Sequence, residues 1–254
     1  MFNDKPYAEV NREERFFCFL FAHALLMSRS VRFGFAKLAK EKYNVHLDPD
    51  ALEVYVEAAA LRDYWFNLGD PVSYSEKMDK RRREVLEQIL EYFKVPSGIL
   101  DKHALFKTSM GKLWSPSHWN INALKNAGLD KYNFIDGGDQ YNLIDVKWAF
   151  NAKPDIVLIS PESMLVIEAK LESAEGCNAA SGYGQYKIQR LIMKLWKLLI
   201  PKFANKQLQF ALLKVKGSSE KSIIWSKLTE LIAKSDADNF TRESFDILKK
   251  RYYP

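Results

Sequence analysis

The chain has 254 residues, of which 47% are apolar, and a formal net charge of +6. This composition argues against a disordered protein, and the length allows one substantial core, with or without a smaller helical domain. The modest positive charge is compatible with a polyanionic partner. The two cysteines, Cys18 and Cys177, do not resemble a disulfide framework and lack the spacing of a metal site, so we expect a reducing, cytoplasmic setting.

The first part of the chain, residues 1–98, is predicted to be a helical N-terminal region. Apolar residues recur there with the period of a helix, and Asp48-Pro49 is typical of a helix start. The apolar run at residues 16–27 is too short to cross a bilayer, so we expect a buried helix and no membrane partner. The expected helices span residues 13–28, 31–42, 49–65 and 75–93.

The strongest basic cluster lies in the last of these helices and consists of Lys80, Arg81, Arg82 and Arg83. It predicts a contact with the phosphates of a nucleic acid, although a solvated helix turn explains the same residues. The next segment, residues 99–141, is loop-rich and contains closely spaced tryptophans, which is typical of a packed domain junction. We expect it to connect the helical region to a core at residues 142–254.

Two apolar runs, at residues 155–159 and 164–171, have the β-branched and aliphatic composition of buried strands. The four residues between them have turn chemistry. A turn centred on this segment pairs residues whose numbers sum to 323, so that Asp155 faces Glu168. Because side chains alternate along a strand, Lys170 lies on the same face as Glu168.

Asp155 and Glu168, with their Cβ atoms about 5 Å apart, would repel each other without a cation between them. Two carboxylates and the backbone carbonyl of Ala169 are oxygen ligands that suit Mg²⁺, with Mn²⁺ as a substitute. Lys170 would then orient the attacking water or balance charge as a phosphate is attacked. The alternative is an ordinary hairpin that ends in a surface ion pair between Glu168 and Lys170.

Pro154-Asp155 and Glu168-Ala169-Lys170 resemble the motif of the PD-(D/E)XK nuclease superfamily. The resemblance implies an α/β, restriction-endonuclease-like fold, with an αβββαβ core in which helices flank a mixed central sheet. It covers about the second half of the chain, where the expected element types follow in the same order. These elements are a strand at 142–150, the hairpin, a helix at 184–203, a strand at 207–215 and a helix at 219–234.

The helix expected at 184–203 gathers apolar side chains on one face, which should lie on the sheet. Gln185 and Gln189 lie on or beside that face, and the resemblance implies that Gln185 supports the metal site. A boundary position bonded to water or backbone explains both glutamines equally well. The opposite face carries a basic stripe, for which we expect a solvated surface rather than a phosphate-binding one. The stripe consists of Lys187, Arg190, Lys194 and Lys197.

Many members of the superfamily carry a further metal-binding glutamate on the helix before the first strand. The segment nearest upstream, at residues 119–129, contains no glutamate. We therefore expect Glu57 to fill this role, with Glu53 and Glu84 as alternatives, which requires a long insertion before the strand. Ordinary surface charges on helices explain all three residues as well.

The sequence thus predicts a Mg²⁺-dependent nuclease that hydrolyses phosphodiester bonds, of DNA rather than RNA, in restriction, other defence or repair. Patterns of other catalytic classes, such as a zinc-binding HExxH pair or a serine nucleophile elbow, do not occur in the sequence. The alternative is a catalytically inactive nuclease-fold module that binds nucleic acid or a protein partner. Many nucleases of this kind pair to cut both strands, which leaves a homodimer open.

Overall fold

The computed structural model describes residues 14–69, 76–96, 98–171, 177–178, 183–215 and 222–253. The chain divides into two compact units, each built from separate stretches of sequence. Unit 1 comprises Met1–Ala58, Pro154–Ala174 and Lys206–Pro254, and unit 2 comprises Ala59–Lys153 and Glu175–Asn205. The domain boundaries that we expected, at residues 98 and 141, both fall inside unit 2.

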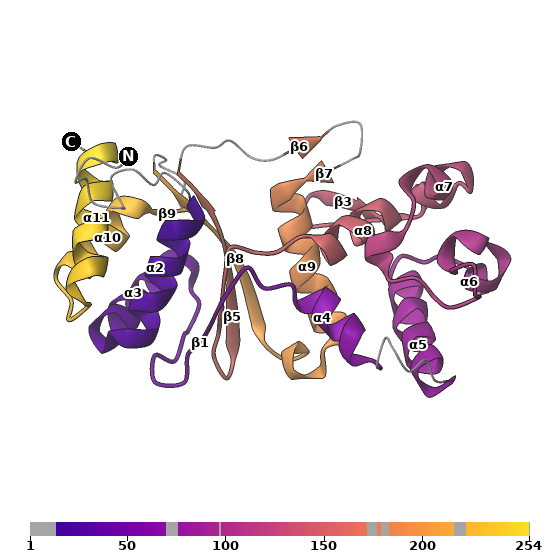
Figure 1. Ribbon diagram of the computed structural model, residues 1–254, viewed down its shortest axis with the longest axis horizontal. Coiled ribbons are helices and arrows are strands. Elements are labelled where there is room, and N and C mark those ends of the chain that lie inside the picture. Colours follow the sequence, from indigo (N-terminus) through magenta and orange to yellow (C-terminus); the bar gives the residue numbers. More distant parts are fainter. Residues whose placement is uncertain are drawn as a thin grey trace. The chain divides into compact units, whose positions relative to one another are not determined.

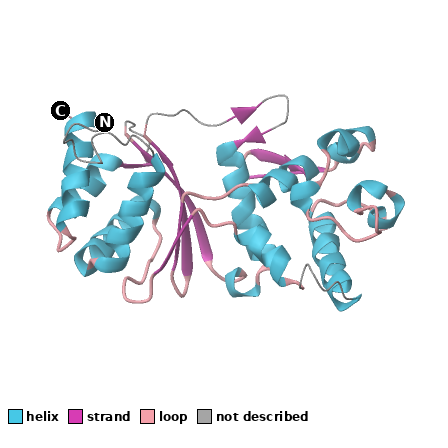
Figure 2. Ribbon diagram, in the orientation of Figure 1, coloured by secondary structure: helices cyan, strands magenta, loops and turns pink. Residues whose placement is uncertain are grey.

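The strands of unit 1 are β1 (Glu53–Val56), β4 (Ile156–Ile159), β5 (Ser163–Lys170), β8 (Gln207–Lys214) and β9 (Ser222–Ile224). They form one mixed sheet in the order β1-β4-β5-β8-β9 (Figures 1 and 2). β1, β4 and β5 pair in antiparallel fashion, whereas β8 runs parallel to β5 and β9 runs parallel to β8. The expected α/β class, with a mixed sheet flanked by helices, is confirmed.

The hairpin predicted from the sequence is confirmed, including its register. Ile159 pairs with Met164, so the numbers of paired residues sum to 323 as expected. The turn closes with a 2.9 Å hydrogen bond from the Ser160 N–H to the Ser163 carbonyl oxygen. Every residue of β4 and β5 is buried, which explains why both strands are continuous apolar runs rather than alternating ones.

Four helices cover one face of this sheet and form the main core of unit 1 with it (Figure 1). They are α2 (Glu14–Met27), α3 (Arg29–Tyr43), α10 (Trp225–Ala233) and α11 (Asn239–Tyr252). Ile156, Ile167 and Leu213 point to this face from three strands and are at most 1% exposed. Replacing a buried side chain of this size by alanine costs about 2–5 kcal/mol. The core therefore fixes which face each strand residue presents.

α2 and α3 confirm the first two expected helices and meet at Ser28. Ser28 caps α3, because its side-chain oxygen accepts a 3.1 Å hydrogen bond from the Val31 N–H. Among the described residues, no single helix is long and apolar enough to cross a membrane, and α2 and α3 reach that length only as a pair bent by 110°.

The third expected helix, at residues 49–65, is wrong. Its middle forms β1, and the helix α4 (Ala60–Asn67) begins only afterwards, in unit 2. Val54 and Val56 are β-branched residues that suit the pairing of β1 with β4. Glu57 then takes a left-handed conformation with φ of 53°, which ends the strand. The last expected helix, at 219–234, similarly contains β9 followed by α10, and residues 219–221 lie outside the described residues.

Unit 2 is mainly helical, with two small antiparallel sheets formed by the pairs β2-β3 and β6-β7. Its longest helix, α5 (Glu76–Tyr92), confirms the fourth expected helix, whose first expected residue, Ser75, lies outside the described residues. The remaining elements are α6 (Ile99–Lys102), α7 (Ile121–Asn126), β2 (Asn133–Asp136), β3 (Asp139–Asn142), α8 (Leu143–Asn151), β6 (Cys177–Asn178), β7 (Tyr183–Gly184) and α9 (Gln185–Leu199), with short 3₁₀ turns at Ala104–Phe106, Pro116–His118, Leu129–Lys131 and Pro201–Phe203.

The strand expected at residues 142–150 is wrong, because this segment forms the helix α8. The Asn142 side chain accepts hydrogen bonds from the backbone N–H groups of Ile144 and Asp145. The Asp145 carboxylate in turn accepts a 2.8 Å hydrogen bond from the Asn142 N–H. This reciprocal capping box satisfies donors that the start of a helix otherwise leaves unpaired. It favours a helix over a strand at this point of the chain.

The helix expected at 184–203 is confirmed as α9, which ends at Leu199 shortly before Pro201. Its apolar face is buried, as expected from the periodicity. Its main helix contacts are with α4, α5 and α8 of unit 2, whereas we expected this face to lie on the central sheet. β8 follows α9 in the chain and pairs parallel to β5.

Candidate active site

The candidate site lies in unit 1, where β4 begins and β5 ends. Asp155, Glu168 and Lys170 are only 9%, 1% and 8% exposed. The Lys170 ammonium donates a 2.9 Å hydrogen bond to Glu168 Oε1. Asp155 Oδ2 accepts a 2.8 Å hydrogen bond from the Ala169 N–H. The alternative of a surface ion pair is wrong, because all three charged groups are buried.

The proline before Asp155 shapes the site through the backbone. Continuing the hairpin register places Pro154 opposite Ala169. In an antiparallel pair, the N–H and C=O groups of one residue point to the same neighbouring strand. The Ala169 N–H points to Asp155, so the Ala169 carbonyl points to that side as well. Pro154 has no N–H to offer this carbonyl. The Ala169 oxygen is therefore positioned as an acceptor beside the Asp155 carboxylate.

A third carboxylate, Glu14, completes the cluster and was missed in the sequence. Its Oε1 accepts a 3.1 Å hydrogen bond from the Lys170 ammonium, and its Oε2 accepts a 2.8 Å hydrogen bond from the Leu171 N–H. Glu14 is the first residue of α2, 156 positions before Lys170. No local pattern in the sequence distinguishes Glu14 from its neighbour Glu13, because the contact with Lys170 depends on tertiary structure.

The three carboxylates share one nearby ammonium, and the pKa values reflect this imbalance. Burial raises the pKa of Asp155 above its ordinary value. Burial and then the adjacent Asp155 carboxylate raise the pKa of Glu168. Burial by itself lowers the pKa of Lys170, but Glu168 and then Glu14 outweigh it, so the pKa lies above its ordinary value. Lys170 is thus held as a cation, while the acidic pair lacks full compensation.

The donor chemistry of this pair fits a hard divalent cation. Asp155, Glu168 and the Ala169 carbonyl supply oxygen ligands on one side of the strand ends, as Mg²⁺ prefers. Burial is the main cause of the raised pKa of both carboxylates, and a bound cation would favour their charged forms. Within the described ranges, no set of three or more His, Cys, Asp or Glu side chains converges as metal ligands.

The three glutamates expected as the upstream ligand have different surroundings. The Glu57 N–H donates a 3.1 Å hydrogen bond to the Asp155 carbonyl, but its carboxylate pairs with Arg15 at 3.3 Å. Glu53 pairs in register with Ile159, at the opposite end of β4, so its expected role is wrong. Glu84 lies on α5 in unit 2. Glu14 is the upstream glutamate that contacts the site.

Gln185 begins α9, in unit 2, and is partly buried. Gln189, one turn later, is 1% exposed within the same helix. The placement of Gln185 beside the carboxylates stays a prediction.

Three of the four residues in the basic stripe of α9 form ion pairs instead of the solvated surface that we expected, whereas Lys197 is exposed as expected. Lys187 binds Asp145 at 2.7 Å, and Arg190 binds both carboxylate oxygens of Asp139 at 2.6 and 2.9 Å. Lys194 forms an ion pair with Asp136. The Lys187 and Lys194 ammonium groups also lie 5.7 and 5.8 Å from the ring centroid of Tyr141. These residues hold α9 to β2, β3 and α8 within unit 2.

The cluster Lys80 to Arg83 is divided by the geometry of α5. Arg82 is 8% exposed, and its guanidinium lies 5.1 Å from the Trp65 ring, so its expected contact with nucleic acid is wrong. Arg83 forms two 3.0 Å hydrogen bonds with Asp101. Lys80 and Arg81 are exposed. The cluster therefore offers two outward cations rather than four.

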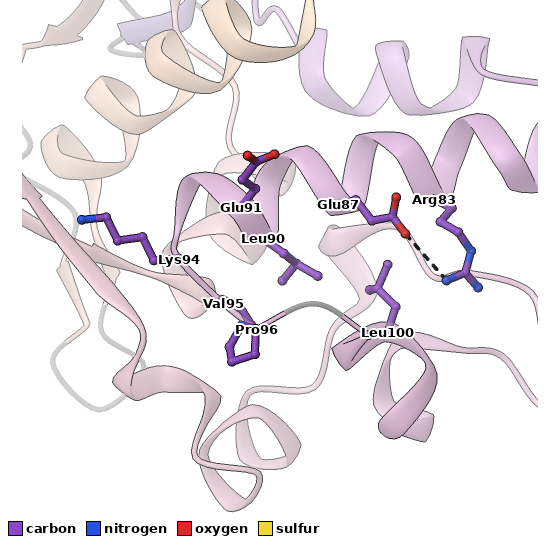
Figure 3. Close-up of a pocket in the computed structure, with 9 residues that line it drawn as sticks. Arg83, Glu87, Leu90, Glu91, Lys94, Val95, Pro96 and Leu100 are labelled. Atoms are coloured by element: carbon purple, nitrogen blue, oxygen red, sulfur yellow. Dashed lines mark ion pairs between the residues drawn. The ribbon is translucent and has the colours of Figure 1, made fainter.

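A cavity of about 510 Å³ lies in unit 2, beside the second half of α5, the segment that follows it and the start of α6 (Figure 3). Leu90, Val95, Pro96 and Leu100 give it an apolar lining. Arg83, Glu87, Glu91 and Lys94 add charged groups, and the figure shows the ion pair of Arg83 with Glu87. Arg83 is the only residue of the expected site or basic cluster that lines this cavity.

Comparison of the chain with family models, with curated proteins and with solved structures gives no match in any of the three.

Proposed function

We propose that the chain is a Mg²⁺-dependent nuclease that hydrolyses the phosphodiester bonds of DNA. The observation that carries this proposal is the buried pair Asp155 and Glu168, which lies beside the Ala169 carbonyl and the Lys170 ammonium. Two neighbouring buried carboxylates are unfavourable in a purely structural role, because their charges repel each other at low dielectric. A divalent cation removes this cost and supplies the chemistry of hydrolysis.

The order of elements along the chain supports the proposal. α2 precedes the antiparallel strands β1, β4 and β5, α9 follows them in the chain, and β8 then pairs parallel to β5. This is the αβββαβ order that the resemblance to the PD-(D/E)XK superfamily implies. Unit 2 then contains a long insertion between β1 and β4. The insertion explains why the glutamate on the preceding helix, Glu14, is so distant in sequence.

Each residue of the site has a distinct role in the proposed reaction. Asp155, Glu168 and the Ala169 carbonyl would hold Mg²⁺, which polarises the phosphate and lowers the pKa of a bound water. Glu168 and Glu14 hold the Lys170 ammonium by hydrogen bonds of 2.9 and 3.1 Å. Lys170 stays protonated and orients the attacking water or balances the charge that develops on the phosphate. Glu14 positions Lys170 and also fixes the backbone at Leu171.

The proposal is tested by incubating the protein with supercoiled, linear and single-stranded DNA and with RNA, over a range of Mg²⁺ and Mn²⁺ concentrations. The test variants are Glu168→Ala and Lys170→Ala. We expect the rate of DNA cleavage by each to fall about a thousandfold, because stabilisation by a metal ion or a charged group amounts to several kcal/mol. EDTA should abolish cleavage by the wild-type protein.

Glu162→Gln is the matched control, because Glu162 is an exposed carboxylate in the turn at the other end of the same hairpin. It should cleave as the wild-type protein does. Equal residual cleavage by the wild type and both test variants would indicate a contaminating nuclease and reject the proposal. Binding of DNA without cleavage by a folded wild-type protein would favour the inactive nuclease-fold module instead. Preference for the RNA substrate would correct the substrate class.

A further inference from the structure

The end of β5 has a second lysine beside Lys170. In the parallel register of β5 and β8, Lys170 pairs directly with Lys214, and Ala169 pairs with Leu213. Neighbouring strands lie about 4.8 Å apart, so the two lysine side chains start from adjacent positions. Both residues are the last of their strands. The sheet therefore ends in two adjacent basic side chains at the candidate active site.

The two lysines also lie on the same face of the sheet. Leu213 points into the core of unit 1 and is 0% exposed. Because side chains alternate along a strand, Lys214 points to the opposite face, as Glu168 and Lys170 do. The Lys214 residue is partly exposed, whereas Lys170 is buried. Lys214 can therefore reach a molecule that approaches this face from solvent.

The backbone around Lys214 is fixed on both sides. Lys214 pairs with Ile224 of β9 as well as with Lys170. The hydroxyl of Tyr253 donates a 2.7 Å hydrogen bond to the carbonyl oxygen of Val215, the residue that follows. The end of β8 is thus held in place by β5, β9 and the segment after α11. A side chain on such a rigid element meets a ligand at a defined position.

The charges of the site explain why a second cation is needed there. Glu14, Asp155 and Glu168 surround Lys170 and outnumber it, so the Lys170 charge is already compensated. A polyanion that approaches this cluster is repelled unless other positive groups lie at its margin. Lys214, adjacent to Lys170 in the strand register, is a positive group at that margin.

We propose that Lys214 binds a backbone phosphate of the nucleic-acid substrate and so positions the scissile phosphate at the carboxylate pair. This inference rests on the proposed nuclease function and assigns Lys214 as a substrate-binding residue of the same site. Lys170 acts on the reacting phosphate, and Lys214 contacts a neighbouring phosphate of the strand. The contact is electrostatic, so it contributes to affinity for any sequence and weakens as salt is added.

The test is the binding of a fluorescently labelled DNA duplex in EDTA, measured by anisotropy at several salt concentrations. It requires no cleavage. Lys214→Ala should bind about tenfold more weakly than the wild type, and the slope of log K against log salt should fall by about one. Lys214→Arg should restore most of the affinity, because arginine also binds phosphate. Circular dichroism confirms that each variant is folded.

Lys42→Ala is the matched control. Lys42 is an exposed lysine in the last turn of α3. The carbonyl oxygen of Asn44, the C-cap of this helix, accepts a 3.2 Å hydrogen bond from the side chain of Gln207. Gln207 is the first residue of β8, whereas Lys214 is the last, so Lys42 lies near the end of β8 that is remote from Lys214. Lys42→Ala should therefore leave both the affinity and the salt slope unchanged.

The outcomes separate this inference from the proposed function. Cleavage by the wild type together with an unchanged salt slope in Lys214→Ala would reject the role of Lys214 and leave the nuclease standing. A reduced slope in a protein that cleaves no DNA would support the phosphate contact and reject the nuclease. A wild-type protein that neither binds nor cleaves DNA would overturn both.

Discussion

Two clusters of buried or partly buried charges in this protein differ in how their charges are balanced. In unit 2, Asp139 has its own partner, Arg190, which binds both carboxylate oxygens. In unit 1, the carboxylates of Asp155 and Glu168, together with Glu14, lie around the ammonium of Lys170.

The pKa values follow this difference. Burial raises the pKa of Asp139, but the hydrogen bonds from Arg190 and Tyr141 outweigh it, so its pKa lies below the ordinary value. The pKa of Glu168 is raised by burial and by Asp155, and Lys170 does not offset this. A matched ion pair holds elements together, whereas an unmatched set of carboxylates leaves room for a cation. The comparison therefore separates a structural cluster from a candidate catalytic one.

The largest expected effect that tests this comparison is stabilisation by metal. Mg²⁺ at about one hundred times its dissociation constant should raise the free energy of unfolding by about 2.7 kcal/mol, because it binds only the folded site. Glu168→Gln should remove this gain, and Asp139→Asn should retain it. The measurement is urea unfolding with Mg²⁺ and with EDTA. An equal gain in both variants would show that Mg²⁺ binds elsewhere.

The next effect is the cost of removing one charge from each cluster. Asp139→Asn should lower the free energy of unfolding by about 1.5 kcal/mol, the contribution of hydrogen bonds to a charged group. Glu168→Gln in EDTA should lower the free energy of unfolding by less, because the glutamine oxygen still accepts the hydrogen bond from Lys170 and the substitution removes the repulsion between Glu168 and Asp155. Urea unfolding at neutral pH measures both, with Glu162→Gln as the control. Equal losses in the two variants would contradict the distinction between the clusters.

The smallest effect is on the pH dependence of stability without metal. Because the folded pKa of Glu168 is raised, the folded state binds more protons than the unfolded state above the ordinary glutamate pKa of about 4.3. Stability should therefore fall as pH rises from there through the raised pKa, by at most about 1.4 kcal/mol per pH unit. The lowered pKa of Asp139 changes stability with pH in the opposite direction. Its contribution to the free energy of unfolding is lost as pH falls below about 3.9 through that lowered pKa.

Urea unfolding in EDTA at a series of pH values measures this dependence. Above the ordinary glutamate pKa, the free energy of unfolding should decrease less steeply with pH in Glu168→Gln than in the wild type. Asp139→Asn should show the same decrease as the wild type. An unchanged slope in Glu168→Gln would mean that Glu168 is ionised in the folded protein at the same pH as in the unfolded chain.

The hairpin at the site was predictable from sequence because its geometry is local. A short turn between two apolar runs fixes the register, and the register fixes which residues face each other. Asp155, Glu168 and Lys170 therefore fall on one face as expected. The capping signal of Asn142 and Asp145 was equally local, but the apolar residues around it fitted a strand pattern as well as a helix. That ambiguity of short apolar runs explains the error over α8.

Glu14 was not predictable in the same way, because its contact with Lys170 spans 156 positions of the chain. In the sequence, residues Ala59–Lys153 of unit 2 stand between the hairpin and α2. Lys214 is a similar case, since its position beside Lys170 depends on the parallel pairing of β5 with β8. Residues that tertiary structure brings together carry no local pattern that identifies them.

The order in which the chain is synthesised adds a consequence of this interleaved architecture. α2 and β1 leave the ribosome early, but β4 and β5 follow only after Ala59–Lys153, and β8 only after Glu175–Asn205. β5 has its neighbours on both sides only when β8 has been made. Chain segments of unit 2 can pack before that point, whereas the sheet of unit 1 depends on pairings between distant stretches, which form slowly. The site is therefore assembled late in synthesis, so a nascent chain that stops before residue 207 carries Glu14, Asp155 and Glu168 but lacks β8 and β9, which complete the sheet.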